Sequence, residues 1–252
     1  MTRVLSGVVL AAAALAAIVF LPDVGLRILA CLVAALAAHE YLRLVGGSEG
    51  QIGGVVIFTW LVSTGALAML AWIPAVMLLF AGVNILYSRS TFSSAVLGAF
   101  AIVYISVPLG LLAALRIGHG WRATLLLIAT VVVSDSLQYY TGRAFGRRPL
   151  APTISPKKTI EGAVGGILAG TLFMAIAGGL EFPERPWPWL AALGFFLVVL
   201  GILGDLFESR LKRDAQVKDS SSLIPGHGGV LDRIDALLFA TPAFAMALGV
   251  VQ

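Results

Sequence analysis

Acidic side chains at the end of a long apolar stretch are the first sign of chemistry in this sequence. Asp205 comes just after the apolar run 198–203. In a helix, Asp205, Glu208, Ser209 and Lys212 would share one face, because their spacing is i, i+3, i+4 and i+7. A solvated helix end is enough to explain Glu208 and Lys212. Asp205 would lie at the edge of a membrane, where an acid needs a partner and is a functional candidate.

Two further acids, Asp232 and Asp235, open the last apolar stretch and also share one helix face. One loop joins the two helix ends, so Asp205 and Asp232 can be brought together. Carboxylates this close repel each other unless a cation lies between them. Oxygen ligands without a Cys or His cluster favour a hard ion, Mg²⁺ before Zn²⁺. We therefore predict a magnesium site with Asp205, Asp232 and Asp235 as its ligands.

The loop 209–230 between these acids is basic and ends in a glycine-rich turn around His227. Glycine lets backbone N–H groups approach a ligand closely, and such arrangements bind anions. The cytoplasmic charge bias of membrane proteins explains the basic run alone, but not the glycine turn or the acids. Together these features predict a site for a polyphosphate and its metal. The candidates are Lys212, Arg213, Lys218, Asp219, His227, Gly228 and Gly229, followed by Arg233.

A second polar loop, 142–159, gives the same indication. Asp135 precedes it within an apolar stretch, and we favour a functional role over satisfied packing beside Ser134. The pattern predicts that Ser155 caps the following helix and that Pro156 begins it. Two lysines in a first helical turn oppose the helix dipole unless an anion binds there. The predicted substrate-binding residues here are Asp135, Ser155, Lys157, Lys158 and Thr159.

The composition shows what must position these side chains. Hydrophobic residues make up 59% of the 252 residues and charged residues 12%, whereas a soluble domain has about 25% charged residues. The apolar residues come in long blocks rather than in alternation, which favours membrane helices over a barrel. The single Cys31 excludes a disulfide framework and a thiolate metal site. The sequence therefore predicts an all-α, polytopic membrane protein.

Nine stretches are long enough, or nearly so, to cross an apolar core of about 30 Å. We predict spans at about 4–21, 24–45, 53–72, 74–87, 93–115, 121–141, 160–180, 187–208 and 231–251. The fourth is short and begins at Pro74, so eight spans is the alternative. The first also resembles a signal peptide, although more membrane-like sequence follows it. We divide the chain into N-terminal spans one to four (1–92) and a catalytic region (93–252).

The basic residues favour nine spans with a cytoplasmic N-terminus. Under that topology, 13 of the 17 Lys and Arg residues lie on the cytoplasmic side, together with the loops 142–159 and 209–230. The four on the other side are Arg27, Arg116, Arg122 and Arg185. Without the fourth span, the two polar loops would lie on the opposite side of the membrane from the early basic loops.

The residues singled out above resemble a known motif. The chain contains the pattern Ser209-x-Leu211-Lys212-Arg213, four residues, Lys218-Asp219, then Pro225-x-His227-Gly228-Gly229-x-x-Asp232-Arg233-x-Asp235. This pattern is similar to the motif of the phosphatidate cytidylyltransferases (CDP-diacylglycerol synthases). The segments 204–209 and 155–162 also resemble that family. The resemblance begins near Asp135, where Asp-Ser-Leu-Gln-Tyr-Tyr departs from the expected Asp-x-x-Ala-Tyr, and the first four spans match only in hydrophobicity.

The resemblance implies the reaction of CTP with phosphatidic acid to give CDP-diacylglycerol and pyrophosphate. It also implies Mg²⁺ with K⁺ as a second ion, nine spans, a homodimer, and a bacterial cytoplasmic membrane with the site facing the cytoplasm. By position, Asp205 and Asp232 would hold the metals, and Ser209 and Lys212 would line the same site. The residues expected to be catalytic are Asp205, Ser209, Lys212, Lys218, Asp219 and Asp232.

Other functions remain open from the residues alone. A CTP-dependent lipid-alcohol kinase would transfer the γ-phosphate instead, and an ion-coupled transporter could use the acids as an ion path. A scaffold gripping anionic lipid would explain the basic loops but not the acids. We find no inverted repeat, nucleophile elbow, Walker A loop or zinc motif. A phosphate monoester is already ionised and needs none of them, and nothing indicates nucleic-acid binding.

Overall fold

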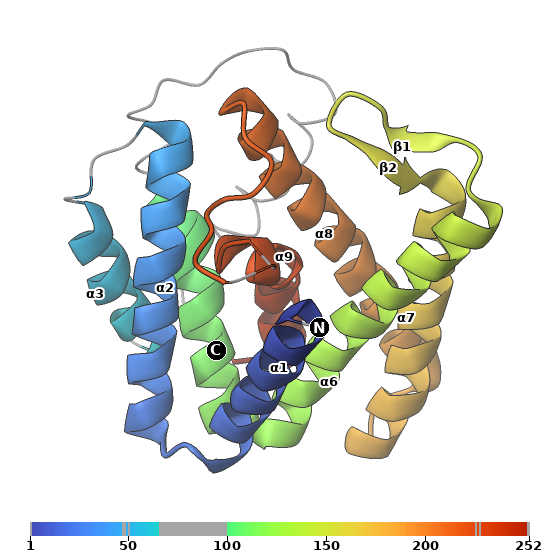
Figure 1. Cartoon of the computed structure of the whole chain (residues 1–252). Helices are drawn as coiled ribbons and strands as arrows, with labels where there is room; N and C mark the ends of the chain where they lie inside the picture. The colour runs from blue at the N-terminus through green and yellow to red at the C-terminus, as the bar shows by residue number, and fades with distance from the viewer. Residues whose placement is uncertain are drawn as a thin grey trace.

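The computed structural model describes residues 2–46, 49, 51–65, 100–224, 226 and 228–250. Helices dominate this part of the chain, which confirms the predicted all-α class (Figure 1). The elements are α1 (Thr2–Phe20), α2 (Asp23–Val45), α3 (Gln51–Ser63), the π-helix η2 (Ile102–Ser106), α6 (Val107–Phe145), β1 (Pro149–Ala151), β2 (Ser155–Thr159), α7 (Ile160–Glu181), α8 (Trp187–Asp214) and α9 (Leu231–Ala247).

Four of the described helical segments are long and apolar enough to cross a membrane. They are α2, the segment Val103–Phe145, α7 and α8. Two shorter apolar segments lie at Gly7–Phe20 and Ile52–Ser63. The predicted fourth span, together with parts of the third and fifth, lies outside the described residues.

The helix α6 contains the predicted sixth span and the last part of the fifth. The segment Val103–Phe145 has 43 residues, and a straight helix of that length would be roughly 65 Å long, about twice an apolar bilayer core. Gly120 divides it, with φ 84° and ψ 174°, a conformation that L side chains rarely adopt. Figure 1 shows the two arms of α6 running in different directions. The interruption predicted between residues 115 and 121 is therefore confirmed.

Helix α7 packs closely on the second arm of α6 through glycines spaced four residues apart. A Cβ added to Gly162 would lie 2.7 Å from the carbonyl oxygen of Gln138, and one added to Gly166 would lie 2.9 Å from that of Ser134. Small residues at this spacing let helix backbones touch in a membrane.

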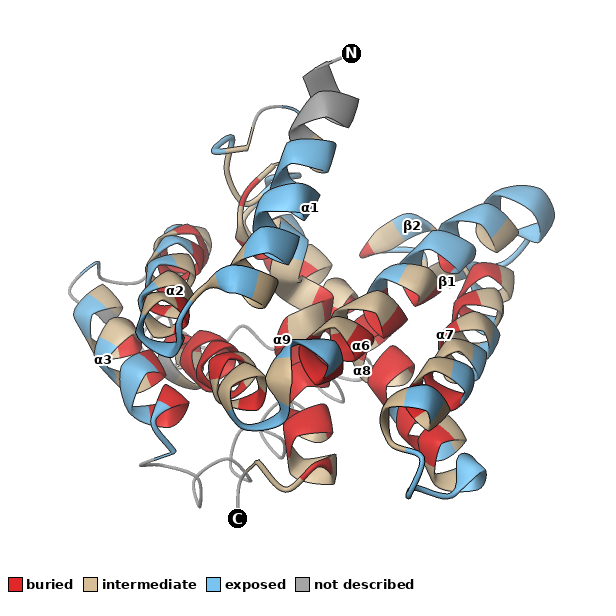
Figure 2. Ribbon diagram, turned by 90° about the horizontal axis from the view of Figure 1, so that it is seen from below, coloured by how far each residue is buried: buried red, intermediate tan, exposed pale blue. Residues whose placement is uncertain are grey.

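The opposite face of α7 carries large exposed apolar side chains, at Leu168, Leu172, Ile176 and Leu180. Figure 2 shows both buried and exposed positions along this helix. An exposed apolar stripe on a bundle helix is a surface for lipid.

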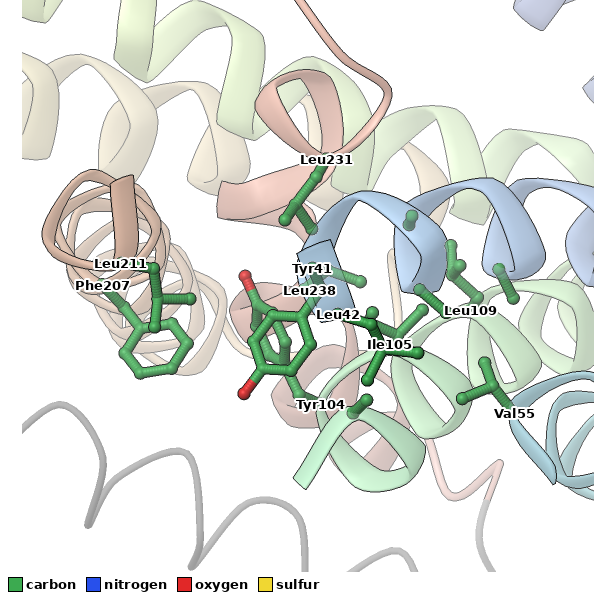
Figure 3. Packing of buried hydrophobic residues seen from close by; sticks show 14 of the residues in the cluster. Tyr41, Leu42, Val55, Tyr104, Ile105, Leu109, Phe207, Leu211, Leu231 and Leu238 are labelled. Carbon is green, nitrogen blue, oxygen red and sulfur yellow. The ribbon is translucent and has the colours of Figure 1, made fainter. Parts of the chain in front are cut away.

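An aromatic cluster joins α2, η2, α8 and α9 just below the polar helix ends. Tyr41, Tyr104, Phe207 and Phe239 are all buried. The ring centroids of Tyr104 and Phe207 are 5.1 Å apart. Figure 3 shows Tyr41, Tyr104 and Phe207 among the buried side chains of this cluster. Large buried rings contribute much of the apolar contact in a core. This packing fixes where the last turns of α8 and the first turn of α9 lie.

The helix start predicted at Ser155 and Pro156 is wrong. Ser155–Thr159 forms the strand β2, which pairs antiparallel with β1. Thr159 caps α7 instead: it is extended, and its hydroxyl accepts a hydrogen bond from Gly162 N at 3.1 Å. The hairpin is favoured because Leu150 and Ala151 pack on an apolar cluster that includes residues of α7 and α8. The lysines predicted for a helical turn therefore lie on a strand.

Candidate active site

The polar ends of α8 and α9 meet at a glycine. A Cβ added to Gly204 would lie 2.5 Å from the carbonyl oxygen of Asp235, so only a residue without a side chain allows this approach. The contact brings Asp205, the next residue on α8, into electrostatic range of Asp235. The strand β2 reaches the same place, because Lys158 pairs with Asp205.

Asp205 has few protein partners. Its Oδ2 pairs with Lys158 Nζ, and its Oδ1 accepts from Ser209 Oγ at 3.3 Å. The side chain of Asp205 is 30% exposed. Ser209, predicted to share a helix face with Asp205, thus lies beside it, and part of the carboxylate is accessible.

Asp232 is held far more completely. Its Oδ1 accepts from Lys212 Nζ at 2.5 Å, and its Oδ2 accepts from Ser220 N, Ser220 Oγ and Gly229 N at 2.8–2.9 Å. The side chain is 5% exposed. Gly228, at φ 81°, turns the backbone beside this carboxylate, and a Cβ there would lie 2.6 Å from Asp232 Oδ2. The glycines predicted to approach a ligand therefore also approach Asp232.

Glu208 is the acid whose role was underestimated from the sequence. A solvated helix end was enough to explain it there, but the residue is fully buried. It pairs with Lys212, which also binds Asp232, so one ammonium group joins two carboxylates. Glu208 Oε1 has no hydrogen-bond donor among the described residues.

Two more acids complete this cluster. Asp235 accepts from Ala236 N at 2.7 Å and lies in electrostatic range of Asp205 and Asp135. Asp135, on α6, is exposed and also interacts with Lys158. Carboxylates from α6, α8 and α9 thus outnumber the lysines between them.

The donor set suits a hard cation. It consists of carboxylate oxygens, it carries excess negative charge, and it includes the donor-free oxygen of buried Glu208. Within the described part of the chain, no three or more His, Cys, Asp or Glu side chains are already arranged around a metal position. The assignment of Asp205, Asp232 and Asp235 as metal ligands therefore stays a prediction.

Glu40, on α2, is a further buried acid: it is 3% exposed and lies against the loop before α9. Its two carboxylate oxygens accept four hydrogen bonds, from Ser220 Oγ, Ser221 Oγ, Val230 N and Leu231 N, at 2.7–3.0 Å. An acid within the apolar stretch 24–45 was a signal for function that sequence reasoning did not use.

Comparison with known proteins now adds to this geometry. A sequence profile of the cytidylyltransferase family matches residues 1–251. The chain is 33% identical, over 254 aligned residues, to a phosphatidate cytidylyltransferase of Bacillus subtilis, covering 95% of this chain and 94% of the relative. The chain belongs to the cytidylyltransferase family.

Two other relatives match over a shorter segment. The phosphatidate cytidylyltransferase of Pseudomonas aeruginosa is 46% identical over 127 residues, covering 49% of this chain and 47% of the relative. That of Haemophilus influenzae is 44% identical over 131 residues, covering 50% of this chain and 46% of the relative. These matches span about half the length of each relative.

The remaining predicted residues of this cytidylyltransferase-family chain belong to the two polar loops or follow them directly in sequence. Arg213 connects the two polar loops, since its Nε donates to Ile154 O at 3.3 Å and its Nη1 to Val217 O at 3.2 Å. Ser155 is partly buried on β2. His227 lies outside the described residues. Four further predicted site residues are exposed: Lys157, Lys218, Asp219 and Arg233.

Proposed function

We propose that this protein is a phosphatidate cytidylyltransferase, which transfers CMP from CTP to phosphatidic acid and gives CDP-diacylglycerol and pyrophosphate. The observation that carries this proposal is the nearly full-length similarity to the Bacillus subtilis enzyme of that name. The site agrees with it chemically. Acids and lysines gather where the ends of α8 and α9 meet in an apolar bundle, so a lipid phosphate and a water-soluble nucleotide can meet there.

In the proposed reaction, a phosphate oxygen of phosphatidic acid attacks the α-phosphorus of CTP. A new P–O bond forms, the anhydride bond between the α- and β-phosphorus breaks, and pyrophosphate leaves with the bonding electrons. Lys158, at the accessible Asp205, is placed to neutralise phosphate charge as it develops. Lys212 is held by Glu208 and Asp232, so its contribution is a fixed positive charge deeper in the site.

We assign Mg²⁺, with K⁺ as a second ion, to the carboxylates of this cluster. Asp205, Asp232 and Asp235 are the residues expected to hold the ions, with Glu208 Oε1 as a further acceptor. Bound there, Mg²⁺ would act as a Lewis acid toward the phosphate oxygens. Without it, the chain's own lysines neutralise only part of the carboxylate charge.

The remaining features of the proposal concern the membrane. We propose nine spans in a bacterial inner membrane and a cytoplasmic N-terminus. The site would face the cytoplasm, where CTP is available. The charge bias of the sequence supports that orientation. A homodimer is the proposed assembly.

A single assay tests the reaction against its alternatives. Detergent-purified protein is given CTP, Mg²⁺ and phosphatidic acid, and both pyrophosphate release and the lipid product are measured. The proposal requires pyrophosphate and a nucleotidylated lipid in equal amounts. A parallel reaction with diacylglycerol in place of phosphatidic acid tests the kinase alternative, which would give a lipid monophosphate and CDP. Absence of both products in an intact preparation would contradict an enzymatic function.

A further inference from the structure

The carboxylate of Glu40 is bonded in a symmetrical way. Oε1 accepts from Ser221 Oγ at 2.7 Å and Val230 N at 3.0 Å, and Oε2 accepts from Ser220 Oγ at 3.0 Å and Leu231 N at 2.8 Å. Each oxygen thus takes one hydroxyl and one backbone N–H. All four donors come from the loop before α9 and from the start of that helix.

This arrangement requires a carboxylate. A hydroxyl can reverse its role as donor, but a backbone N–H cannot. An amide side chain at residue 40 would turn its NH₂ group toward either Val230 N or Leu231 N, whichever way it was oriented. The negative charge is also favourable here, because the first N–H groups of a helix have no partner within the helix and carry a partial positive charge.

Ser220 connects Glu40 to the candidate site. Its hydroxyl, which has one hydrogen, is shared between Glu40 Oε2 at 3.0 Å and Asp232 Oδ2 at 2.8 Å, and its backbone N donates to the same Asp232 oxygen at 2.9 Å. Gly229, the other backbone donor to Asp232, lies against both Ser220 and Glu40, since an added Cβ would collide with Ser220 Oγ and Glu40 Oε2. Glu40 therefore holds both segments of chain that hold Asp232.

We propose that Glu40 is a positioning residue for the CMP transfer: from α2, it anchors the loop before α9 and thereby fixes Asp232 and its partner Lys212. The inference rests on the proposed function for its catalytic consequence, but the anchoring itself does not. It assigns to the N-terminal helices a direct part in shaping the site. Glu40 acts through Ser220 and the start of α9, and the substrate is bound by the residues beyond them.

Two measurements on full-length protein in detergent test this. The first is hydrogen exchange at the backbone amides of Ser220, Gly229, Val230 and Leu231. The second is kcat and KM for CTP in the transfer to phosphatidic acid. Glu40→Gln should speed exchange at these amides and lower kcat about 10- to 100-fold, with a smaller change in KM, as expected when a supporting residue of a site is altered. Glu184→Gln, an exposed glutamate beside Arg185, is the control and should change neither.

A pair of neighbouring serines gives a second test, and its single variants do not depend on Glu40→Gln folding. Ser220→Ala and Ser221→Ala each remove one hydroxyl from Glu40, but only Ser220 also contacts Asp232. Ser220→Ala should lower kcat more than Ser221→Ala. In the Glu40→Gln background the effect of Ser220→Ala should shrink, because residues that act in one network are not additive.

The outcomes separate the two proposals. Unchanged exchange at the four amides in Glu40→Gln would overturn the anchoring. Faster exchange with a wild-type kcat would overturn the positioning role. A wild-type protein that makes no CDP-diacylglycerol would overturn the proposed function instead, while the exchange measurement would still decide whether Glu40 anchors the loop.

Discussion

Asp205 and Asp232 each pair with one lysine, but the two pairs lie in different surroundings. The pair of Asp205 with Lys158 joins α8 to the hairpin, and its aspartate is 30% exposed. The pair of Asp232 with Lys212 joins α9 to α8, and its aspartate is 5% exposed. Asp232 accepts three further hydrogen bonds from the loop, whereas Asp205 accepts one from Ser209.

The difference separates two tasks that acids in one site can have. A carboxylate whose oxygens are already occupied by donors of the chain fixes the backbone around it. A carboxylate with unused acceptor capacity can meet a cation or balance a substrate's charge. By this reasoning Asp205, with Asp235 beside it, has the most unused acceptor capacity for an ion or a substrate, and Asp232, also assigned to the ions, has the additional task of fixing the backbone around it.

The strongest test of this comparison is Asp205→Asn. The change removes the charge that pairs with Lys158, and we expect CMP transfer to fall by about 10³-fold with little change in the thermal unfolding midpoint. Asp214→Asn, near the end of the same helix in an exposed pair with Arg210, is the matched control and should keep full activity. Normal incorporation of labelled CTP into lipid by Asp205→Asn would mean that the accessible pair, Asp205 with Lys158, is not part of the reaction.

Neighbouring lysines on β2 sharpen the comparison. Lys158 pairs with Asp205, whereas Lys157 is exposed. Lys158→Met should lower kcat/KM for CTP by about 10²-fold, because an unpaired carboxylate is left in the site and a positive charge is lost. Lys157→Met should cost less than about tenfold, consistent with a screened surface charge. Equal losses for the two variants would contradict the assignment of Lys158 to the accessible pair.

The helices of this region were predictable because hydrophobicity marks them directly. The predicted spans 160–180 and 187–208 correspond to α7 and α8, and the predicted start at 231 is the start of α9. The predicted span ends at 208, whereas α8 continues to Asp214 after the apolar residues end. Hydropathy identifies the part of a helix that fits in lipid, and not the polar turns that extend beyond it.

The pairings within the site could not be predicted in the same way. Lys158 and Asp205 are 47 residues apart in sequence, and Ser220 and Glu40 are 180 apart. Such contacts depend on how a hairpin and a loop fold back on the helices, which no local pattern encodes. Motif spacing identified Asp205 and Asp232 as important, but the sequence did not indicate that one is enclosed and the other accessible.

Gly229→Ala tests the loop around the enclosed pair, Asp232 with Lys212. An added Cβ would collide with Ser220 Oγ and Glu40 Oε2, so we expect a loss of about 1–3 kcal/mol in stability, as for other overpacked positions. Thermal unfolding in detergent measures it. Gly118→Ala, where an added Cβ meets nothing within 4 Å, is the control and should leave the midpoint near that of the wild type. If both variants unfold alike, the loop is not packed against Glu40 as described.

The smallest expected effect concerns Thr159, which follows Lys158 and was predicted to bind substrate. Its hydroxyl caps α7 by accepting from Gly162 N at 3.1 Å, so Thr159→Ala should cost about 1 kcal/mol in stability. Thr159→Ser keeps a capping hydroxyl and should restore most of that loss. Thermal unfolding and KM for CTP are measured together. If capping is the residue's role, KM follows stability and recovers in Thr159→Ser. A raised KM in Thr159→Ser with normal stability would instead indicate that the threonine side chain itself contacts the nucleotide, and would add Thr159 to Asp205 and Lys158 as a third residue.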